Sequence, residues 1–212
     1  MRLELTVKDN IALITMDDGK VNAMDIQWFR EMHALLDEVE EKGYAGLIIK
    51  GRPGVYSGGL NIKWLPEMTG EEARLFRKLF PTTMERIHHL PIPTIAALTG
   101  HAIAGGCIVA CGCDWRVAIE GDYRLQMNEV RVNMTLPDWA IKIVEYTIPR
   151  PWVNYVNGYG EPLSFQKAHE IGVITGLAED DQELMQLVFA QAEANSVVSK
   201  NDFAVTKEKL KR

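Results

Sequence analysis

Two short glycine-rich segments could bind an oxyanion through backbone amides. Gly58 and Gly59 precede Leu60 in the first segment, and Gly105 stands near the end of the second. Glycine permits close approach and unusual dihedral angles, so the N–H groups of Leu60 and Gly105 could point into one cleft. In such an oxyanion hole, removing one donor typically costs about 3 to 4 kcal/mol of transition-state stabilisation. From the glycines alone, a role only in tight turns or close packing is favoured.

Glu129 is the candidate acid–base residue. It follows the short strand-like run 123–127. A carboxylate at the end of a buried strand is partly desolvated, which raises its pKa and makes it a better proton carrier. The alternative is a capping residue, or an ion pair with Arg124 or Arg131. Asp114 is similarly ambiguous, and a structural role is favoured for it.

The histidines and cysteines give weaker signals. His88 and His89 end a helical pattern, where a cationic side chain suits the helix dipole, so we expect them at the solvated surface. His101 lies inside the second glycine segment and could line the cleft, although a packing role is favoured. The three cysteines lie within the short apolar segment 107–113. We expect buried, reduced thiols and no metal site.

The elements that must position these residues alternate between strands and helices. The runs 3–7 and 11–16 predict a β-hairpin. Apolar residues recur at helical intervals after Asp25, a suitable cap, and Gly43 is suited to end this helix. The apolar run 45–50 then predicts a buried strand of a β-α-β crossover.

Each glycine segment follows a predicted strand. Residues 52–60 are rich in glycine and proline and predict a loop, and residues 99–106 predict a second loop after the strand 94–98. Ligands bind where such loops leave the carboxyl ends of parallel strands. A helix over 71–90, stopped by Pro91, lies between the two loops in sequence.

The remainder of the chain becomes increasingly helical. Strand character returns at 115–117 and 123–127, and Pro137 suits the first turn of a helix to about residue 146. Ser164 can cap a helix that Gly172 closes. Further helices are predicted over 181–199 and 202–211. The pattern indicates one compact body with a helical C-terminal portion.

Composition excludes several classes of function. The 212 residues are 47% hydrophobic and carry a formal net charge of −6. No basic stripe offsets this acidity, so nucleic acid is not an expected partner. No apolar stretch reaches the length of a membrane-spanning helix, so no membrane is expected either. The first ten residues lack the pattern of a signal peptide, and we therefore expect mature, cytoplasmic protein.

Taken together, the motifs resemble the crotonase superfamily of enoyl-CoA hydratases and isomerases. The matching segments span nearly the entire chain in order and spacing. They are VNAM (21–24), YSGGLNI (56–62), PTIAALTGHAIAGGCIVACGCD (93–114) and LSFQKAHEIG (163–172). Asn61 stands where an Asp is common in the first glycine motif, a change that we expect to be tolerated.

The resemblance implies an α/β fold, a crotonase-type spiral of β-β-α units with a short helical C-terminal region. The core domain, 1–150, would hold the coenzyme A site and the oxyanion hole, and 151–212 would form the helical region. Homotrimers or homohexamers are implied, with an acyl-CoA thioester as substrate and no separate cofactor. The residues implied to contact the substrate are Ala23, Gly58, Leu60, Ile62, Gly105 and Ile108, with Glu129 catalytic.

Within this superfamily, hydratases resemble one another in using two glutamates. The first position is Ile108 here, and the second aligns with Glu129, in a segment similar to the Asn-Glu signature of Δ3,Δ2-enoyl-CoA isomerases. Moving a double bond needs one base, whereas adding water needs two groups. The resemblance therefore favours an isomerase in fatty acid metabolism. The alternatives are another crotonase reaction, such as hydration, thioester hydrolysis, decarboxylation or dehalogenation, and a non-catalytic CoA-binding protein.

Overall fold

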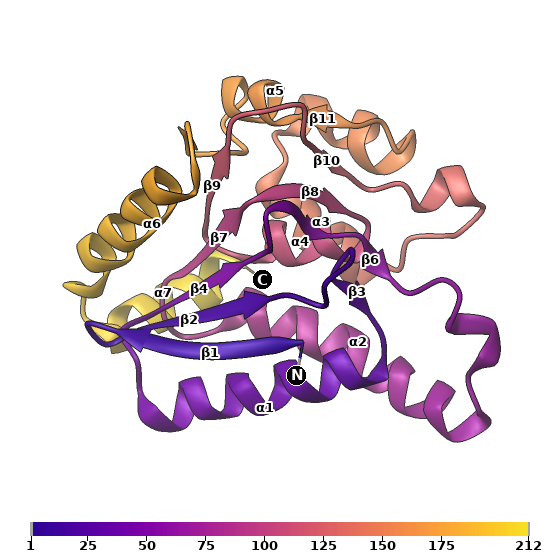
Figure 1. Ribbon diagram of the computed structural model, residues 1–212, viewed down its shortest axis with the longest axis horizontal. Helices are drawn as coiled ribbons and strands as arrows, with labels where there is room; N and C mark the ends of the chain where they lie inside the picture. The colour runs from indigo at the N-terminus through magenta and orange to yellow at the C-terminus, as the bar shows by residue number, and fades with distance from the viewer. Residues whose placement is uncertain (1, 212) are drawn as a thin grey trace.

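The larger of two main sheets runs through the body of the molecule between α6 and α1 in the computed structural model, which describes residues 2–211 (Figure 1). Its order is β1-β2-β4-β7-β9-β12. The strands are β1 (Leu3–Lys8), β2 (Ile11–Met16), β4 (Gly46–Lys50), β7 (Thr94–Leu98), β9 (Trp115–Ile119) and β12 (Gly176–Ala178). β1 and β2 form the predicted antiparallel hairpin, and the other pairs are parallel. The predicted α/β class is confirmed.

A smaller sheet extends from the carboxyl ends of these strands. Its order is β11-β10-β8-β5, and a two-stranded pair, β3 with β6, lies beside it. The strands are β3 (Ala23–Met24), β5 (Gly54–Ser57), β6 (Gly59–Leu60), β8 (Gly100–Ile103), β10 (Arg124–Gln126) and β11 (Leu163–Ser164). β11 and β12 both come from residues 151–212, so this mainly helical region also completes both main sheets.

The prediction that 52–60 and 99–106 are irregular loops was wrong. β5 and β6 lie in the first segment, β8 lies in the second, and β5 pairs with β8 in parallel. These strands are rich in Gly, Ser and Ala, which have low strand propensity. Their structure comes from partners distant in sequence, so the local pattern did not indicate it.

The observed helices agree with the helices that the apolar periodicity predicted. They are α1 (Ile26–Lys42), α2 (Gly70–His89), α3 (Gly105–Gly112), α4 (Asp138–Thr147), α5 (Phe165–Glu170), α6 (Asp181–Ser196) and α7 (Lys200–Leu210). Asp25 caps α1 by accepting from two backbone N–H groups, and Gly43 ends it in a left-handed conformation. Thr69 and Glu72 form a capping box at the start of α2. Within residues 2–211, three 3-10 turns (Leu65–Glu67, Glu129–Val132 and Arg150–Trp152) and a π-helix (Asn154–Gly158) complete the structure.

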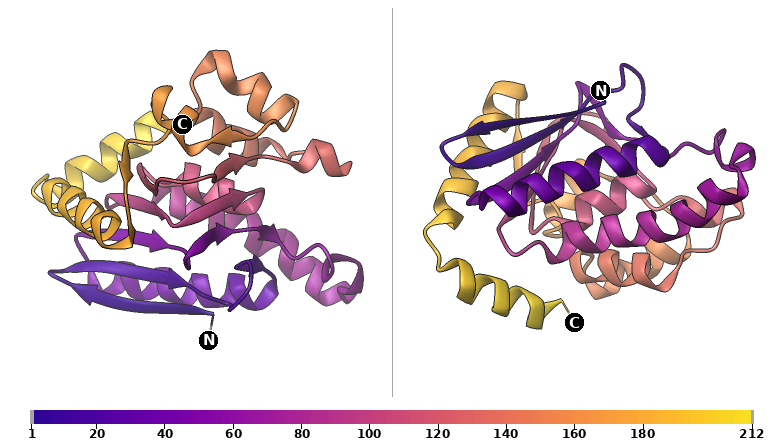
Figure 2. Two further views of the ribbon diagram at one scale, coloured as in Figure 1. Left: turned by 45° about the horizontal axis from the view of Figure 1, so that its top comes forward. Right: turned by 90° about the horizontal axis from the view of Figure 1, so that it is seen from below.

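Helices cover both faces of the larger sheet. α6 packs on one face, where Leu184, Val188 and Ala192 meet inward residues of the strands. The main core lies on the other face, beneath α1, α2, α3 and α4 (Figures 1 and 2). Within the described residues, 2–211, no helix combines the length and apolar character needed to cross a membrane.

Helix α7 is tied to the core through one carboxylate. Asp114 accepts hydrogen bonds from Lys207 Nζ at 2.7 Å and Lys211 Nζ at 2.8 Å. It also accepts from the backbone and hydroxyl of Thr94, at 2.9 and 3.0 Å. Both lysine side chains are buried. The structural role favoured for Asp114 is therefore confirmed, and these interactions hold its pKa below the ordinary value against the opposing effect of burial.

The prediction that His88 lies at the solvated surface was wrong. His88 is only 4% exposed, and its Nδ1 lies 3.3 Å from the carbonyl oxygen of Gly112. Burial, together with the nearby Lys211, lowers its pKa to about 3, so the imidazole is neutral at pH 7. A helix end packed under α7 is a core position, which the sequence of α2 alone does not reveal. The three cysteines are buried thiols, as predicted.

Candidate active site

The two glycine segments meet at the carboxyl edge of the sheets. Gly59 has φ +80, and a Cβ added there would lie 2.8 Å from the backbone nitrogen of Gly105. A Cβ added to Gly105 would in turn lie 3.7 Å from the nitrogen of Leu60. This close approach brings together the two amide groups that were predicted to share one oxygen.

A buried asparagine holds the first segment in place. Asn22 Nδ2 donates to the carbonyl oxygens of Met16 at 2.8 Å and Tyr56 at 3.0 Å. Ser57 Oγ donates to Asn22 O at 2.7 Å and accepts from Gly59 N at 3.1 Å. The N–H of Gly59 is thus occupied by Ser57, and the N–H of Asn61 donates to Met24 O at 2.9 Å. Because successive residues of a strand face opposite sides, we expect the N–H of Leu60 to point away from these two groups.

The second amide belongs to the first residue of α3. The N–H of Gly105 has no acceptor within the helix, and the helix dipole adds a partial positive charge of about one half. Ala104, which precedes it, has φ +50, a left-handed conformation that is unfavourable for a residue with a side chain. Its N–H donates to Gln126 O at 2.8 Å. The strained residue turns the chain so that the helix begins at the cavity.

Glu129 begins the 3-10 turn that follows β10. Its Oε2 atom is buried and has no hydrogen-bond partner among residues 2–211. Burial raises the pKa of its carboxyl above the ordinary value of 4.5. The alternative of an ion pair with Arg131 does not hold, because Arg131 pairs with Glu161. Glu129 therefore has the desolvated environment that the sequence predicted.

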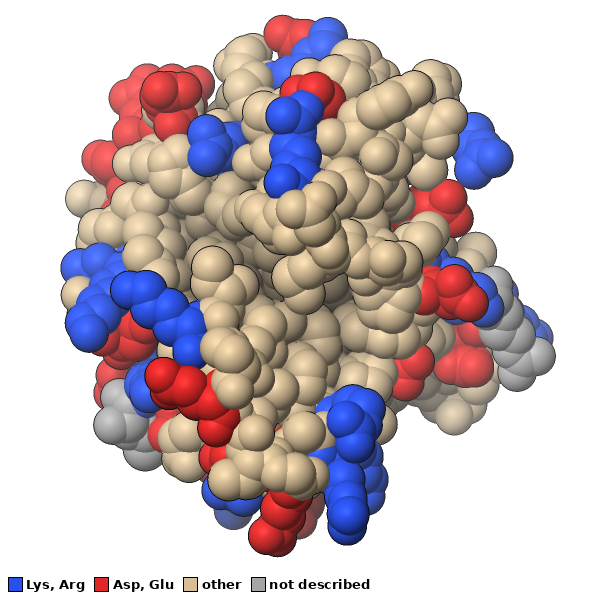
Figure 3. Space-filling view, turned by 90° about the vertical axis from the view of Figure 1, so that its right-hand side faces the viewer, with Lys and Arg blue, Asp and Glu red and all other residues tan. Residues whose placement is uncertain are grey.

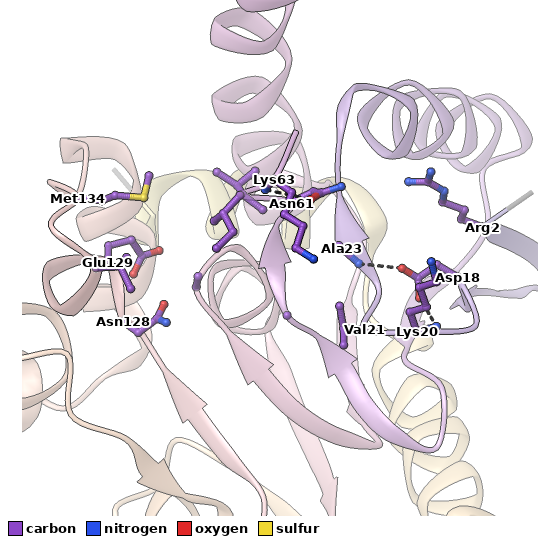
Figure 4. A pocket seen from close by; sticks show the side chains of 15 residues that line it. Arg2, Asp18, Lys20, Val21, Ala23, Asn61, Lys63, Asn128, Glu129 and Met134 are labelled. Carbon is purple, nitrogen blue, oxygen red and sulfur yellow. Dashed lines mark hydrogen bonds between the residues drawn. The ribbon is translucent and has the colours of Figure 1, made fainter. Parts of the chain in front are cut away.

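A cavity of about 550 Å³ connects these features. The residues at one end are Asn128, Glu129 and Met134, and those at the other are Arg2, Asp18 and Lys20 (Figure 4). Asn61 and Lys63 lie between them. The face that carries β3 and β6 is largely uncharged in the middle, with charged side chains around its rim (Figure 3). The site thus joins an apolar centre to a polar, partly basic end.

Most of the predicted site residues surround this cavity. It is lined by Ala23, Gly58, Leu60, Ile62 and Glu129. Gly105 is buried directly behind Gly59, whereas Ile108 is 2% exposed and lies outside the lining. His101 is placed elsewhere, in contact with the ring of Tyr123.

Sequence reasoning missed several lining residues. Asn128, Val132 and Met134 flank Glu129, and their place next to the candidate base was the available signal. Lys63 directly follows the first glycine motif, 56–62, and that adjacency was the available signal, whereas Arg2 comes from a segment that gave no sign of a binding role. Only the assembled fold brings these side chains together.

This arrangement is suited to proton transfer next to a carbonyl group. Two adjacent backbone N–H groups can stabilise an enolate oxygen, and a carboxylate with a raised pKa can remove and return a carbon-bound proton. Among the described residues, no group of three or more His, Cys, Asp or Glu side chains is placed to hold a metal ion.

Comparison with known proteins places this site in a family. Residues 6–212 match the family described as enoyl-CoA hydratase/isomerase. A probable enoyl-CoA hydratase from Bacillus subtilis is 29% identical over 90% of this chain and 74% of its own length. The human mitochondrial enoyl-CoA delta isomerase 1 is 25% identical over 81% of this chain, which spans only 58% of that relative.

Solved structures agree with this assignment. A probable enoyl-CoA hydratase from Mycobacterium tuberculosis has a TM-score of 0.91 and 28% identity, with 99% of this chain and 88% of that chain covered. A second structure of the same protein, described as an enoyl-CoA isomerase, has a TM-score of 0.90 and 29% identity, with 99% and 90% covered. The predicted crotonase-type fold is confirmed. The chain belongs to the enoyl-CoA hydratase/isomerase family of the crotonase superfamily.

Proposed function

We propose that this protein is an isomerase that converts a 3-enoyl-CoA into the conjugated 2-enoyl-CoA. Glu129 takes a proton from C2 of the acyl chain and returns it at C4, while the double bond moves from C3–C4 to C2–C3. The amides of Leu60 and Gly105 stabilise the dienolate oxygen between the two transfers. No cofactor beyond the coenzyme A of the substrate takes part.

The single observation that carries the proposal is one unpaired, desolvated carboxylate in the same cavity as Leu60, whose backbone nitrogen lies close to the start of α3 at Gly105. A hydratase reaction would need a second group to complete the addition of water, and Ile108, at the position expected for it, can supply none. One base with a raised pKa is sufficient for a proton shuttle. Both kinds of enzyme occur among the relatives by name.

The shape of the cavity suits the rest of the substrate. The acyl thioester would lie at the end with Glu129, and Met134 and Ile62 would contact the acyl chain. The phosphates of coenzyme A would lie toward Arg2, Lys20 and Lys63, whose charges complement them (Figure 4). We also propose a trimer or a pair of trimers, which sedimentation analysis would test.

The decisive experiment incubates purified protein with trans-3-hexenoyl-CoA and follows formation of the conjugated product. Glu129→Gln should lower kcat by roughly 10²-fold to 10⁴-fold while coenzyme A binding, measured by calorimetry, is retained. Glu170→Gln, a similar change at an exposed residue on α5, serves as the control. Absence of turnover by the wild-type protein, with intact binding, would remove the isomerase proposal.

Hydration is the second candidate, because the Bacillus subtilis relative and several structural neighbours carry that name. Supplying trans-2-hexenoyl-CoA and measuring 3-hydroxyhexanoyl-CoA separates the two reactions. A hydratase would form the hydroxy product rapidly. An isomerase would leave the conjugated thioester largely unchanged.

A further inference from the structure

A short segment outside the cavity packs against the turn that carries Glu129. This segment, Tyr159–Glu161, is called the clamp segment here, and the turn, 128–133, is called the Glu129 turn. None of the three clamp residues belongs to the cavity lining. Any effect of the clamp segment on chemistry would therefore pass through the turn.

Polar contacts join the clamp segment to both sides of Glu129. Before Glu129, the buried Gln126 donates from Nε2 to Gly160 O at 2.8 Å. After it, Arg131 donates from Nε to Tyr159 O at 3.0 Å and forms an ion pair with Glu161. Glu129 thus lies in sequence between two residues, Gln126 and Arg131, that are both bonded to the clamp segment.

Gly160 brings the two segments closer than any other residue type would allow. It is buried and has φ +63. A Cβ there would lie 2.9 Å from Met127 O, 3.0 Å from Val130 Cγ2 and 3.2 Å from Arg131 Cγ. Because the nearest of these atoms is the backbone of Met127, which leads directly into the Glu129 turn, and the other two are side-chain atoms of the turn, a side chain at this position would have to displace the start of the turn.

The Glu129 turn has few other restraints. Residues 130–135 are exposed, so hydrophobic burial contributes little to holding the turn. Its backbone bonds, such as Met134 N to Glu129 O at 2.8 Å and Arg131 N to Asn128 O at 2.9 Å, are internal. Internal bonds define the shape of the turn, but they do not fix its distance from the oxyanion hole.

Backbone hydrogen bonds join the clamp segment to the π-helix that precedes it in the sequence. Tyr159 N donates to Asn154 O at 2.9 Å, and Glu161 N donates to Tyr155 O at 3.0 Å. Inside this helix Asn157 is 8% exposed, and its amide atoms have no hydrogen-bond partner within the part of the chain described. A π-helix with an unsatisfied buried amide is unfavourable by itself, and such features concentrate near functional sites.

We propose that the clamp segment positions Glu129 relative to the oxyanion hole, with Gly160 setting the distance and Arg131 the orientation of the turn. The inference rests on the proposed function, in which one carboxylate must reach both C2 and C4. An error of about 1 Å in the placement of a reacting group can cost 10²-fold in rate.

The main test compares Gly160→Ala with Gly43→Ala. Gly43 ends α1 with φ +65, and an added Cβ would meet nothing within 4 Å. Both substitutions place alanine at nearly the same positive φ, +63 and +65, so both carry the strain of that φ. Only Gly160→Ala should also lower kcat for trans-3-hexenoyl-CoA, by about 10-fold or more, with KM changed about 2-fold or less.

A spectroscopic measurement separates this inference from the proposed function. The carboxyl carbons of glutamate are labelled with ¹³C, and Glu129→Gln identifies the signal of Glu129 for an NMR titration. Displacing the turn loosens its packing, so the Glu129 pKa should fall by about half a unit or more in Gly160→Ala. It should stay at the wild-type value in Gly43→Ala. This result needs no turnover.

A second variant remains informative if Gly160→Ala does not fold. Arg131→Met keeps the length of an exposed side chain but removes both of its contacts to the clamp segment. It should lower kcat about 3-fold to 10-fold and move the Glu129 pKa in the same direction. Arg150→Met, at a side chain 87% exposed, is its control and should do neither.

The outcomes are distinct. Lower kcat together with a shifted Glu129 pKa in the clamp variants, and in neither control, supports the inference. Clamp variants that match their controls in both measurements overturn it. If the wild-type protein shows no isomerase activity, the proposed function fails, and the titration alone then decides whether the clamp segment positions Glu129.

Discussion

The carboxylate of Glu129 combines two properties that a proton carrier needs. It borders the substrate cavity, and one of its oxygen atoms is buried without a partner among the described residues. Desolvation disfavours the charged form and raises the pKa, which strengthens the carboxylate as a base. Its residue type and its position after a strand were visible in the sequence, whereas the unpaired oxygen was not.

The pH dependence of the reaction should report this environment. Glu129 must be deprotonated to accept the C2 proton, so kcat/KM should fall as the pH falls through the pKa of Glu129 in the free enzyme. Because that pKa is raised, the midpoint should lie above 4.5. Initial rates with trans-3-hexenoyl-CoA across the acidic range would measure it. A midpoint at or below 4.5 would show that burial does not raise the pKa of the group that controls the reaction.

At the scale of elements, the proposed oxyanion hole depends on how closely β6 approaches α3. A Cβ on Gly59 would lie 2.8 Å from Gly105 N and 2.8 Å from Ile103 O. Gly59→Ala should therefore separate the two amides and lower kcat by roughly 10²-fold, comparable to the loss of one oxyanion donor. Gly54→Ala is a suitable control, since it shares φ +80 but has open space around it. Equal activity of the two variants would argue against the hole.

The attachment of α7 gives a prediction about stability. Replacing Asp114 with Asn leaves the ammonium groups of Lys207 and Lys211 buried without their counter-ion. Loss of one partner from a buried ion pair typically costs about 3 to 5 kcal/mol. Urea unfolding should show a decrease of this size. Asp181→Asn, which disrupts the exposed pair with Lys50, should lower the free energy of unfolding by about 1 kcal/mol or less.

The elements that the sequence predicted correctly are those with local signals. The hairpin over 3–16 and α1 carry their periodicity and their turn or cap residues within a few positions. β5 and β8 were missed because each begins with glycine in a glycine-rich segment and their pairing joins distant parts of the chain. The motif resemblance pointed to Leu60 and Glu129, which line one cavity in the structure, because it depends on order and spacing instead of local propensity. The clamp segment gave no comparable signal.

At the scale of the whole molecule, buried ionisable groups make the fold sensitive to acid. His88 has a pKa of about 3 in the folded state against an ordinary 6.5. Between these values the unfolded chain binds a proton that the folded chain does not, so stability falls as the pH falls from 6.5 toward 3. Asp114 adds a second loss below its ordinary 3.8, because its folded pKa is lowered.

Urea unfolding at pH 7 and at pH 5 would test the contribution of His88. The wild-type protein should lose about 1 to 2 kcal/mol from this residue between the two conditions. The His88→Gln variant should be less stable than the wild-type protein at pH 7. Between pH 7 and pH 5, however, its free energy of unfolding should fall by about 1 to 2 kcal/mol less than that of the wild type. Parallel pH profiles for the two proteins would show that His88 does not control this range.

The buried position of Cys107, Cys111 and Cys113 gives the protein an internal reporter of its own motions. All three thiols lie on or directly after α3, the helix that begins at the substrate cavity. A thiol reagent can reach them only when that helix separates transiently from its neighbours. The rate of labelling in native buffer would therefore measure how often α3 separates from its neighbours. A bound acyl thioester should slow the labelling.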